Sequence, residues 1–352
     1  MKIAQIAPLY EAVPPRLYGG TERVVAHLTD ALVDLGHQVT LFAAGSSGTQ
    51  ATRVMGRDTP LRLDPELFKS DLASHLNMLH EVKRRARDFD IIHFHIDLLH
   101  FPFFEKMAAR TLTTLHGRLD MKDLPGAYLR WNDFPLVSIS NHQRTALPFA
   151  NWHDNIPHGL ALGAYAPRYQ PGDYLAFLGR ISPEKRPDRA INIAIAAGIP
   201  LKLAAKVDNA DKDYFDAVIK PMLDHPLIEF IGEIDDAQKG TFLGNARALL
   251  FPIDWPEPFG LVMIEAMACG TPVIAWRCGS VPEIIDEGVT GFIVDSEPRA
   301  SEAVAKAGTL DRQQIRRTFE ARFSAQVMAK RYVASYERIL ASHPLIPFKR
   351  TA

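Results

Sequence analysis

Two glutamates bracket the start of an apolar segment in the C-terminal half of the chain. Glu257 and Glu265 are separated by seven residues, and Gly260 lies between them. The pattern predicts a helix that begins near Gly260, and the unpaired N–H groups and partial positive charge of a helix start suit a phosphate. Carboxylates would repel that phosphate, so the glutamates are better suited to accept hydrogen bonds from hydroxyl groups. This combination indicates a nucleotide sugar, although a solvated loop acid and a glutamate on the polar face of an ordinary helix would also account for the pair.

Two cations follow an expected strand earlier in the same half. Residues 174–178 form an apolar run, and Arg180 and Lys185 lie together in the strand-to-helix loop after it. Preorganised cations stabilise the negative charge that accumulates on a departing diphosphate. Arginine binds phosphate oxygens as a fork, and lysine acts as a point charge. A solvated basic loop is the alternative.

The N-terminal half offers a glycine pair and a histidine at strand ends. Gly19 and Gly20 follow the first expected strand, where glycine lets the backbone approach a ligand closely. No G-x-G-x-x-G fingerprint is present there, which weighs against a nicotinamide enzyme. His116 follows the strand expected over 111–115 and could hydrogen-bond a sugar hydroxyl or offer its backbone carbonyl to the reacting centre. An ordinary loop turn and a structural histidine are the alternatives.

A third candidate segment, over 232–239, joins an expected strand to a helix that starts at Asp235 or Asp236. Helix capping explains it in the simplest way. As a binding site, it would meet a nucleobase edge with the backbone of Ile234 and the side chains of Asp236 and Lys239.

Metal binding is not favoured. His93, His95 and Asp97 lie close in sequence, but a further set of ligands at metal-binding spacing is missing. We therefore predict no metal site. Cys269 and Cys278 have no metal-ligand spacing either, and we expect buried thiols.

Repeated strand and helix patterns must position these residues. Strands are expected at 2–8, 38–43, 91–94, 111–115, 134–140 and 155–160, and again at 174–178, 201–205, 228–231, 248–251, 273–275 and 292–294. Helices are expected after an N-cap at Thr21 and over 71–87, 98–109 and 324–340. Such alternation predicts α/β architecture with parallel sheets covered on both faces. We predict two Rossmann-like, doubly wound domains, 1–165 and 166–335, that face each other across a cleft, and a tail over 336–352 as a candidate to pack back on the first.

Length and composition agree with this organisation. A chain of 352 residues favours two domains, and 47% hydrophobic and 23% charged residues are typical of a folded protein. A net charge of −1 argues against a dedicated nucleic-acid binder. We predict a cytoplasmic protein, because no apolar run approaches the roughly 20 residues of a membrane helix and no signal-peptide pattern opens the chain. The basic helix over 75–87 is either a solvated face or a peripheral membrane contact.

Taken together, these motifs resemble the retaining glycosyltransferases of family 4, which have the GT-B fold. The resemblance covers nearly the whole chain, from Gly19-Gly20 through the Gly-Arg-x-x-x-x-Lys stretch at 179–185 to the two glutamates. It implies a nucleoside-diphosphate-sugar donor held mainly by the second domain, no cofactor and no essential metal. It also implies transfer of a hexosyl group with retained anomeric configuration to the hydroxyl of an acceptor, which can be a small molecule, a glycan or a lipid.

The resemblance also assigns roles to residues. Arg180 and Lys185 match the diphosphate-binding cations, Glu257 matches the glutamate on the donor sugar, and Glu265 matches the one on the ribose. Further matches are the backbone amides of Phe259, Gly260 and Leu261 toward sugar and phosphate, His116 near the sugar, and Gly20 near the diphosphate. The stretch over 232–239 is similar to a base-reading loop, which leaves UDP and GDP donors open. A GT-B epimerase or hydrolase of nucleotide sugars, and a noncatalytic sugar-nucleotide-binding protein, are the alternative functions.

Overall fold

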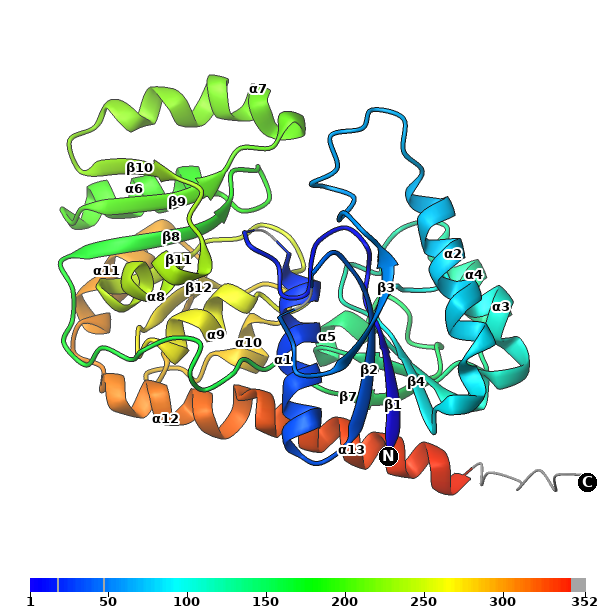
Figure 1. Cartoon of the computed structure of the whole chain (residues 1–352). Coiled ribbons are helices and arrows are strands. Elements are labelled where there is room, and N and C mark those ends of the chain that lie inside the picture. Colours follow the sequence, from blue (N-terminus) through cyan, green and yellow to red (C-terminus); the bar gives the residue numbers. More distant parts are fainter. Residues whose placement is uncertain (18, 47, 343–352) are drawn as a thin grey trace, which may run out of the picture. The chain divides into compact units, whose positions relative to one another are not determined.

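The chain forms two structural units, seen in a computed structural model that describes residues 1–17, 19–46 and 48–342 (Figure 1). Among the described residues, the first unit comprises 1–139, 144–157 and 325–342. The second comprises residues 140–143 and 158–324. The predicted boundaries at 165/166 and 335/336 lie C-terminal to these crossings, and residues 343–352 of the predicted tail lie outside the described part.

The first unit is built on a seven-stranded parallel sheet with the order β3-β2-β1-β4-β5-β6-β7. Its strands are β1 (Lys2–Ile6), β2 (Gln38–Ala44), β3 (Thr52–Arg57), β4 (Ile91–Phe94), β5 (Thr111–Thr114), β6 (Leu136–Ser138) and β7 (Trp152–Asn155). Apart from Lys2 at the start of β1, the central strands β1, β4 and β5 are buried, as expected for a sheet with helices on both faces, although they carry polar residues such as Gln5 and His93. The strand order reverses between β1 and β4, which makes this the switch point of the sheet.

Helices cover both faces of this sheet (Figure 1). On one face, α1 (Gly20–Asp34) packs against α13 (Ala325–Ser342). On the other, one hydrophobic core joins the sheet to α2 (Asp71–Arg84), α3 (Phe101–Phe104) and α4 (Leu124–Arg130). Short 3-10 helices at Ala86–Asp88 and Glu105–Arg110 follow α2 and α3, and α5 (Asn141–Arg144) lies where the chain crosses between the units.

The second unit has a six-stranded parallel sheet with the order β10-β9-β8-β11-β12-β13. Its strands are β8 (Tyr174–Arg180), β9 (Leu201–Lys206), β10 (Ile228–Gly232), β11 (Ala246–Phe251), β12 (Val273–Trp276) and β13 (Gly291–Val294). Here the switch point lies between β8 and β11. The prediction of two doubly wound, Rossmann-like α/β units is confirmed.

Its helices also form two layers (Figure 1). On one face, α6 (Pro187–Ala197) packs against α11 (Glu297–Ala307). On the other are α8 (Asp236–Gly244), α9 (Leu261–Ala268) and α12 (Arg312–Phe323). The helix α7 (Lys212–Tyr214) continues as a π-helical turn (Phe215–Ile219) and a 3-10 turn (Lys220–Asp224), and α10 (Val281–Ile284) is short.

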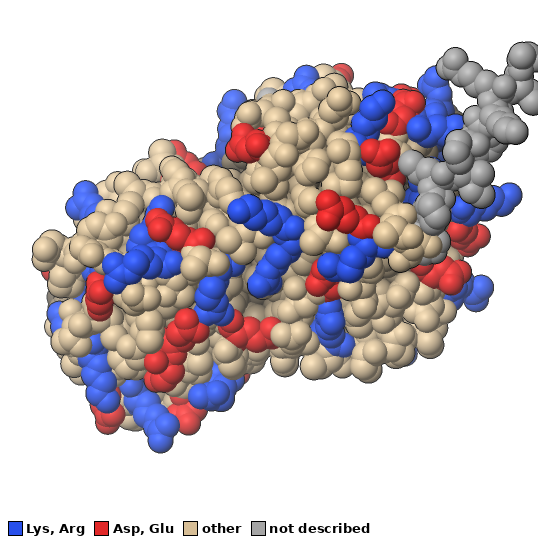
Figure 2. All heavy atoms as spheres, turned by 90° about the horizontal axis from the view of Figure 1, so that it is seen from below, with Lys and Arg blue, Asp and Glu red and all other residues tan. Residues whose placement is uncertain are grey.

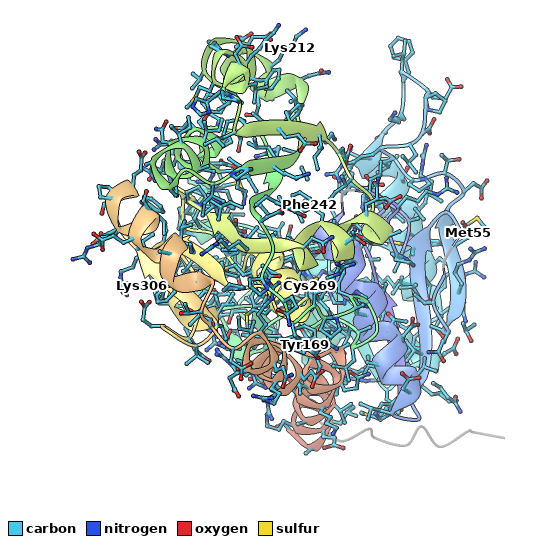
Figure 3. The ribbon with its side chains drawn as sticks, turned by 90° about the vertical axis from the view of Figure 1, so that its left-hand side faces the viewer. Met55, Tyr169, Lys212, Phe242, Cys269 and Lys306 are labelled. Atoms are coloured by element: carbon cyan, nitrogen blue, oxygen red, sulfur yellow. The ribbon has the colours of Figure 1, made fainter. Side chains whose placement is uncertain are left out.

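Side chains of the second unit divide as this layering requires. Phe242 on α8 and Cys269 after α9 are buried in the interior, whereas Lys212 and Lys306 are exposed at the surface (Figure 3). Burial raises the pKa of the Cys269 thiol to about 12, so this cysteine is an inert buried thiol, as predicted. Cys278 is only partly buried.

Acidic and basic side chains are intermingled on the face shown in Figure 2, in keeping with the net charge of −1.

Several local predictions are wrong. The N-cap of α1 is Gly19, with a φ of 146°, and Thr21 lies inside the first turn. The strand β3 was not predicted, because none of its side chains is buried and they form no apolar run. The strand expected over 155–160 lies earlier, at Trp152–Asn155, and the helix expected over 98–109 is split into α3 and a 3-10 helix.

Candidate functional site

The second-unit candidates lie at the switch point of its sheet. Arg180 ends β8, and Lys185 lies in the loop that leads to α6. Glu257 lies in the loop between β11 and α9. Since β8 and β11 are neighbours and parallel, both loops emerge at the carboxyl edge of the sheet, where open α/β sheets bind ligands.

Lys185 and Glu257 meet across these loops. The Nζ of Lys185 donates to Oε2 of Glu257, and Nε1 of Trp255 donates to the same oxygen at 3.1 Å. Nζ also lies 4.8 Å from the ring centroid of Trp255 and 5.7 Å from that of Phe251, within the range of cation–π attraction. The side chains of Lys185 and Glu257 are 21% and 12% exposed, so a cation and an acid are held together within reach of a ligand.

A second loop supports the glutamate from behind. Ser280 donates its N–H to the carbonyl of Glu257 at 3.0 Å and its hydroxyl to the carbonyl of Phe259 at 2.8 Å, while Cys278 Sγ donates to the carbonyl of Trp255 at 2.9 Å. Between them, Gly279 has a φ of 56°, and a Cβ there would lie only 2.4 Å from the Glu257 carbonyl oxygen. The Cys278–Ser280 loop therefore fixes the backbone that carries Glu257.

The helix expected near Gly260 is present. Gly260 is the N-cap of α9 with φ 80° and ψ 66°, a left-handed conformation that favours glycine, and Leu261 begins the helix. A Cβ on Gly260 would lie 2.7 Å from Cε of Met263 and 3.1 Å from Cζ of Phe251. The first N–H groups of a helix lack intrahelical acceptors and suit an anion. Phe259, just before the cap, is buried against His158.

Glu265 lies further along α9 and is almost fully buried. Its Oε1 accepts from the hydroxyl of Tyr165 at 3.2 Å and lies 3.4 Å from Nζ of Lys239. Lys239 also pairs with Asp236 at 3.0 Å, and Ile234 is buried before the start of α8. The structure thus brings Glu265 together with the segment expected to read the base. The N-cap of α8 is Asp235, which forms a capping box with Gln238.

Arg180 has an environment that the sequence did not reveal. Its guanidinium pairs with Glu184 at 2.6 Å, Asp211 at 3.5 Å and Asp208 at 3.8 Å. Three carboxylates therefore surround this cation, and its side chain remains 33% exposed. A phosphate that binds Arg180 must compete with these acids.

The first-unit candidates lie near the switch point of the other sheet. Gly20 begins α1, and the steric requirement for glycine falls on Gly19, where a Cβ would lie 2.8 Å from Cβ of Pro15. His116 follows β5, and its Nε2 lies 2.8 Å from Nδ1 of His95. Burial lowers the pKa of His116 to about 3, so the imidazole is neutral near pH 7.

The neighbouring histidines are also accounted for. His95 bonds to Gln5, and His93 bonds to Tyr336 and Thr114. Over residues 1–17, 19–46 and 48–342, no three His, Cys, Asp or Glu side chains are grouped so that they could hold a metal ion.

In the same part of the chain, no helix combines the length and the apolar character needed to cross a bilayer.

Sequence reasoning missed several residues that complete the second-unit site. Trp255, Tyr165 and the Cys278–Ser280 loop all contact predicted residues. Trp255 lies two residues before Glu257, and a tryptophan beside a site acid is a usable signal. Tyr165 lies 100 positions from its partner, and no local pattern marks it.

The structure has two Rossmann-like units with polar residues at their switch points. Comparison with known proteins identifies it as a glycosyltransferase of GT-B fold. The model described as Glycosyl transferases group 1 matches residues 167–318, and that described as Glycosyltransferase Family 4 matches residues 18–150. The chain belongs to the family 4 glycosyltransferases.

Individual relatives agree with this assignment. Phosphatidyl-myo-inositol mannosyltransferase of Mycolicibacterium smegmatis is 26% identical, over 93% of this chain and 89% of the relative. The crystal structure of AviGT4, a glycosyltransferase involved in avilamycin A biosynthesis, is similar with a TM-score of 0.74 and 26% identity, over 97% of this chain and 98% of AviGT4. The fold also matches that of Anabaena HepE in complex with UDP and glucose, with a TM-score of 0.74 and 18% identity, over 96% and 100% of the two chains.

Proposed function

We propose that this glycosyltransferase takes a hexosyl group from a nucleoside-diphosphate sugar bound to the second unit and transfers it, with retained configuration, to an acceptor hydroxyl. The observation that carries the proposal is the Lys185–Glu257 pair at the switch point, beside the helix start at Gly260. The mannosyltransferase relative and the UDP-bound Anabaena neighbour support a donor of this class.

The diphosphate would bind between the cations and the start of α9. An ammonium group donates three hydrogen bonds, so Lys185 can keep Glu257 and still donate to a phosphate oxygen. Arg180 would supply the second cation, and the backbone amides of Phe259, Gly260 and Leu261 would complete the anion site. These groups stabilise the charge that develops on the departing diphosphate.

The two glutamates would hold the sugars on either side. Glu257 would accept hydrogen bonds from hydroxyls of the transferred sugar. Glu265 would accept from the ribose hydroxyls, because a carboxylate has acceptor capacity beyond its contacts with Tyr165 and Lys239. The base would meet the backbone of Ile234 and the side chains of Asp236 and Lys239.

The chemistry would not need a covalent intermediate or a metal. The acceptor hydroxyl would attack the sugar on the face that the diphosphate leaves, and the leaving phosphate would take its proton. In the first unit, we assign His116 to the sugar and Gly20 to the diphosphate, a proposal that rests on their match to the family motif. Transfer in the presence of EDTA at the rate seen without it is the expected result.

A paired substitution tests the donor site. Lys185→Met and Glu257→Gln should lower kcat/KM for the donor by about 100-fold or more, the usual effect of removing one group that stabilises transition-state charge. The matched control is Lys202→Met, because Lys202 also pairs with a glutamate, Glu229, at 3.0 Å and lies 5.0 Å from a ring centroid, that of Tyr174. If Lys202→Met lost as much activity as Lys185→Met, or if Lys185→Met kept full activity, the assignment would be wrong.

Ligand titration and product analysis separate the remaining alternatives. UDP and GDP added separately should raise the melting temperature, since a ligand that binds only the folded state stabilises it. The nucleotide that does so in the wild type, and much less in Lys185→Met, identifies the donor class. A glycoside as product supports transfer, whereas free or epimerised sugar would indicate a hydrolase or an epimerase, and binding without turnover a noncatalytic protein.

A further inference from the structure

A chain of buried hydrogen bonds runs from His116 to the C-terminal helix within the first unit. His116 Nε2 lies 2.8 Å from His95 Nδ1, and His95 Nε2 lies 2.7 Å from Gln5 Oε1. Gln5 Nε2 donates to the hydroxyl of Tyr336 at 3.2 Å. The same hydroxyl lies 2.8 Å from Nδ1 of His93.

The chain continues for two further links. His93 Nε2 lies 2.7 Å from Thr114 Oγ1, and that oxygen lies 2.8 Å from the hydroxyl of Tyr332. Tyr332 and Tyr336 both belong to α13 and are fully buried. A residue at the end of β5 is thereby connected to a helix more than 200 positions away in sequence.

The direction of this chain determines where His116 carries its proton. Gln5 donates through Nε2, so its Oε1 must accept from Nε2–H of His95. His95 is buried, which favours the neutral ring, and a neutral imidazole has one N–H; Nδ1 of His95 is then an acceptor, and His116 donates to it from Nε2. His116 is therefore the Nε2–H tautomer, and its Nδ1 can only accept.

The other half of the chain has the same direction. Since the Tyr336 oxygen accepts from Gln5, its proton is directed to Nδ1 of His93, and His93 donates from Nε2 to Thr114. Burial lowers the pKa of His93 well below its ordinary value, with the neighbouring His116 as a smaller cause, so this ring is neutral as well. A neutral imidazole donates from one nitrogen and accepts at the other. If the donor and acceptor exchange roles in one hydrogen bond, they must therefore exchange roles in the next hydrogen bond as well.

We propose that Gln5, His95 and Tyr336 are positioning residues that hold His116 in one tautomer and one orientation for glycosyl transfer, so that α13 contributes to the reaction through Tyr336. The proposal rests on the proposed function, since it takes His116 to act in the reaction. Apolar side chains could fill this core without the need to satisfy so many buried polar atoms. A neutral histidine whose second nitrogen is held by a buried partner is the general device for fixing a tautomer.

Gln5→Met is the direct test, because it keeps the length of the side chain and removes both links. Without the Gln5 oxygen, His95 is free to carry its proton on Nδ1 and donate to His116, which moves the His116 proton to Nδ1. We expect kcat to fall about tenfold or more, the size of effect seen for outer partners of metal-bound histidines, with the KM for the donor changed less than about threefold. The tautomer is measured directly on 15N-histidine-labelled protein, with the His116 signals identified from His116→Gln.

Two variants of α13 provide the comparison. Tyr336→Phe removes one hydroxyl of the chain and should lower kcat, but less than Gln5→Met because the links from His116 to Gln5 remain. Arg338→Gln removes the ion pair between α13 and Asp154. This ion pair is not part of the hydrogen-bond chain, so kcat and the His116 spectrum should be unchanged. Circular dichroism and melting temperature establish that each variant is folded.

The outcomes are distinct. A wild-type His116 spectrum and wild-type kcat in folded Gln5→Met would overturn the proposal, as would an equal loss of kcat in Arg338→Gln and Tyr336→Phe. If no variant and no wild-type protein transferred sugar, the proposed function would fail. The spectra would still decide whether Gln5 sets the tautomer of His116.

Discussion

Replacing Gly279 by alanine tests whether the loop after β12 sets the position of Glu257. The added Cβ would lie 2.4 Å from the Glu257 carbonyl oxygen and 2.5 Å from its nitrogen. Real Cβ contacts are essentially never shorter than 3.0 Å, so the two segments must separate by about 0.6 Å, the difference between 3.0 and 2.4 Å. Both neighbours are backbone atoms, so no side chain can rotate away to relieve the contact.

The magnitude follows from two terms. Alanine at a φ of 56° costs about 1 kcal/mol, and forced separation of packed segments costs about 1–3 kcal/mol more. The free energy of unfolding should therefore fall by about 2–4 kcal/mol. Because a misplacement of about 1 Å at a reacting centre can cost about 100-fold in rate, the displaced Glu257 should lower kcat by about tenfold or more.

Gly288→Ala is the matched control. Gly288 has a φ of 73°, and a Cβ there would meet no atom within 4 Å. This variant should lose only about 1 kcal/mol and keep full activity, since it carries the backbone penalty without the clash. Urea denaturation gives the stabilities, and release of nucleoside diphosphate from the donor gives the rates. Equal stability and equal kcat in Gly279→Ala and Gly288→Ala would refute the reasoning.

Two further predictions concern the base-side ion pairs and the effect of acid. Lys239→Met leaves the buried Glu265 with less compensation, so we expect a loss of about 1–3 kcal/mol in stability and weaker nucleotide binding by calorimetry, and unchanged affinity would contradict this assignment. Burial lowers the pKa of five histidines in the first unit, and the shift is largest for His93, His100 and His116. Below about pH 6.5 these three histidines bind protons in the unfolded chain but stay neutral in the folded unit. The free energy of unfolding should therefore fall by about 1.4 kcal/mol per pH unit for each of the three, and for His116 this fall continues down to about pH 3. Protonation of Asp97, whose pKa burial raises to about 6, offsets about 1.4 kcal/mol of that loss at pH 5. Urea midpoints at pH 7.5, 6 and 5 measure the net effect, and constant stability over this range would contradict it.

Much of the fold could be read from the sequence because buried parallel strands are apolar on both faces. The runs that form β1, β8 and β11 were recognisable for this reason. The strands β3 and β7 lie at the two edges of the first sheet and are partly exposed, so they carry no such run. The start of α1 was misplaced because Thr21 is a good N-cap in isolation, whereas the close approach of Pro15 requires glycine at position 19.

The candidate site could be predicted in part, because some candidate residues lie in the loops directly after the strands that position them. Parallel strands end at one edge, which is why Lys185 and Glu257 could be expected to lie close together, and the structure places them in contact. The acids around Arg180 and the hydroxyl of Tyr165 on Glu265 come from distant segments, and only the folded chain brings them together. His93 on β4 and His95 just after it were considered as metal ligands, whereas their partners in the structure include Gln5 and Tyr336, which lie at opposite ends of the sequence.

The placement of α13 has a consequence for biosynthesis. The first unit needs α13 to cover α1 and to bury Tyr332 and Tyr336, yet the ribosome makes α13 only after the whole second unit. While the second unit is translated, the apolar surface of the first unit that α13 later covers stays exposed to solvent. A nascent chain that is released early, or clipped before Ala325, would present that surface to chaperones and proteases.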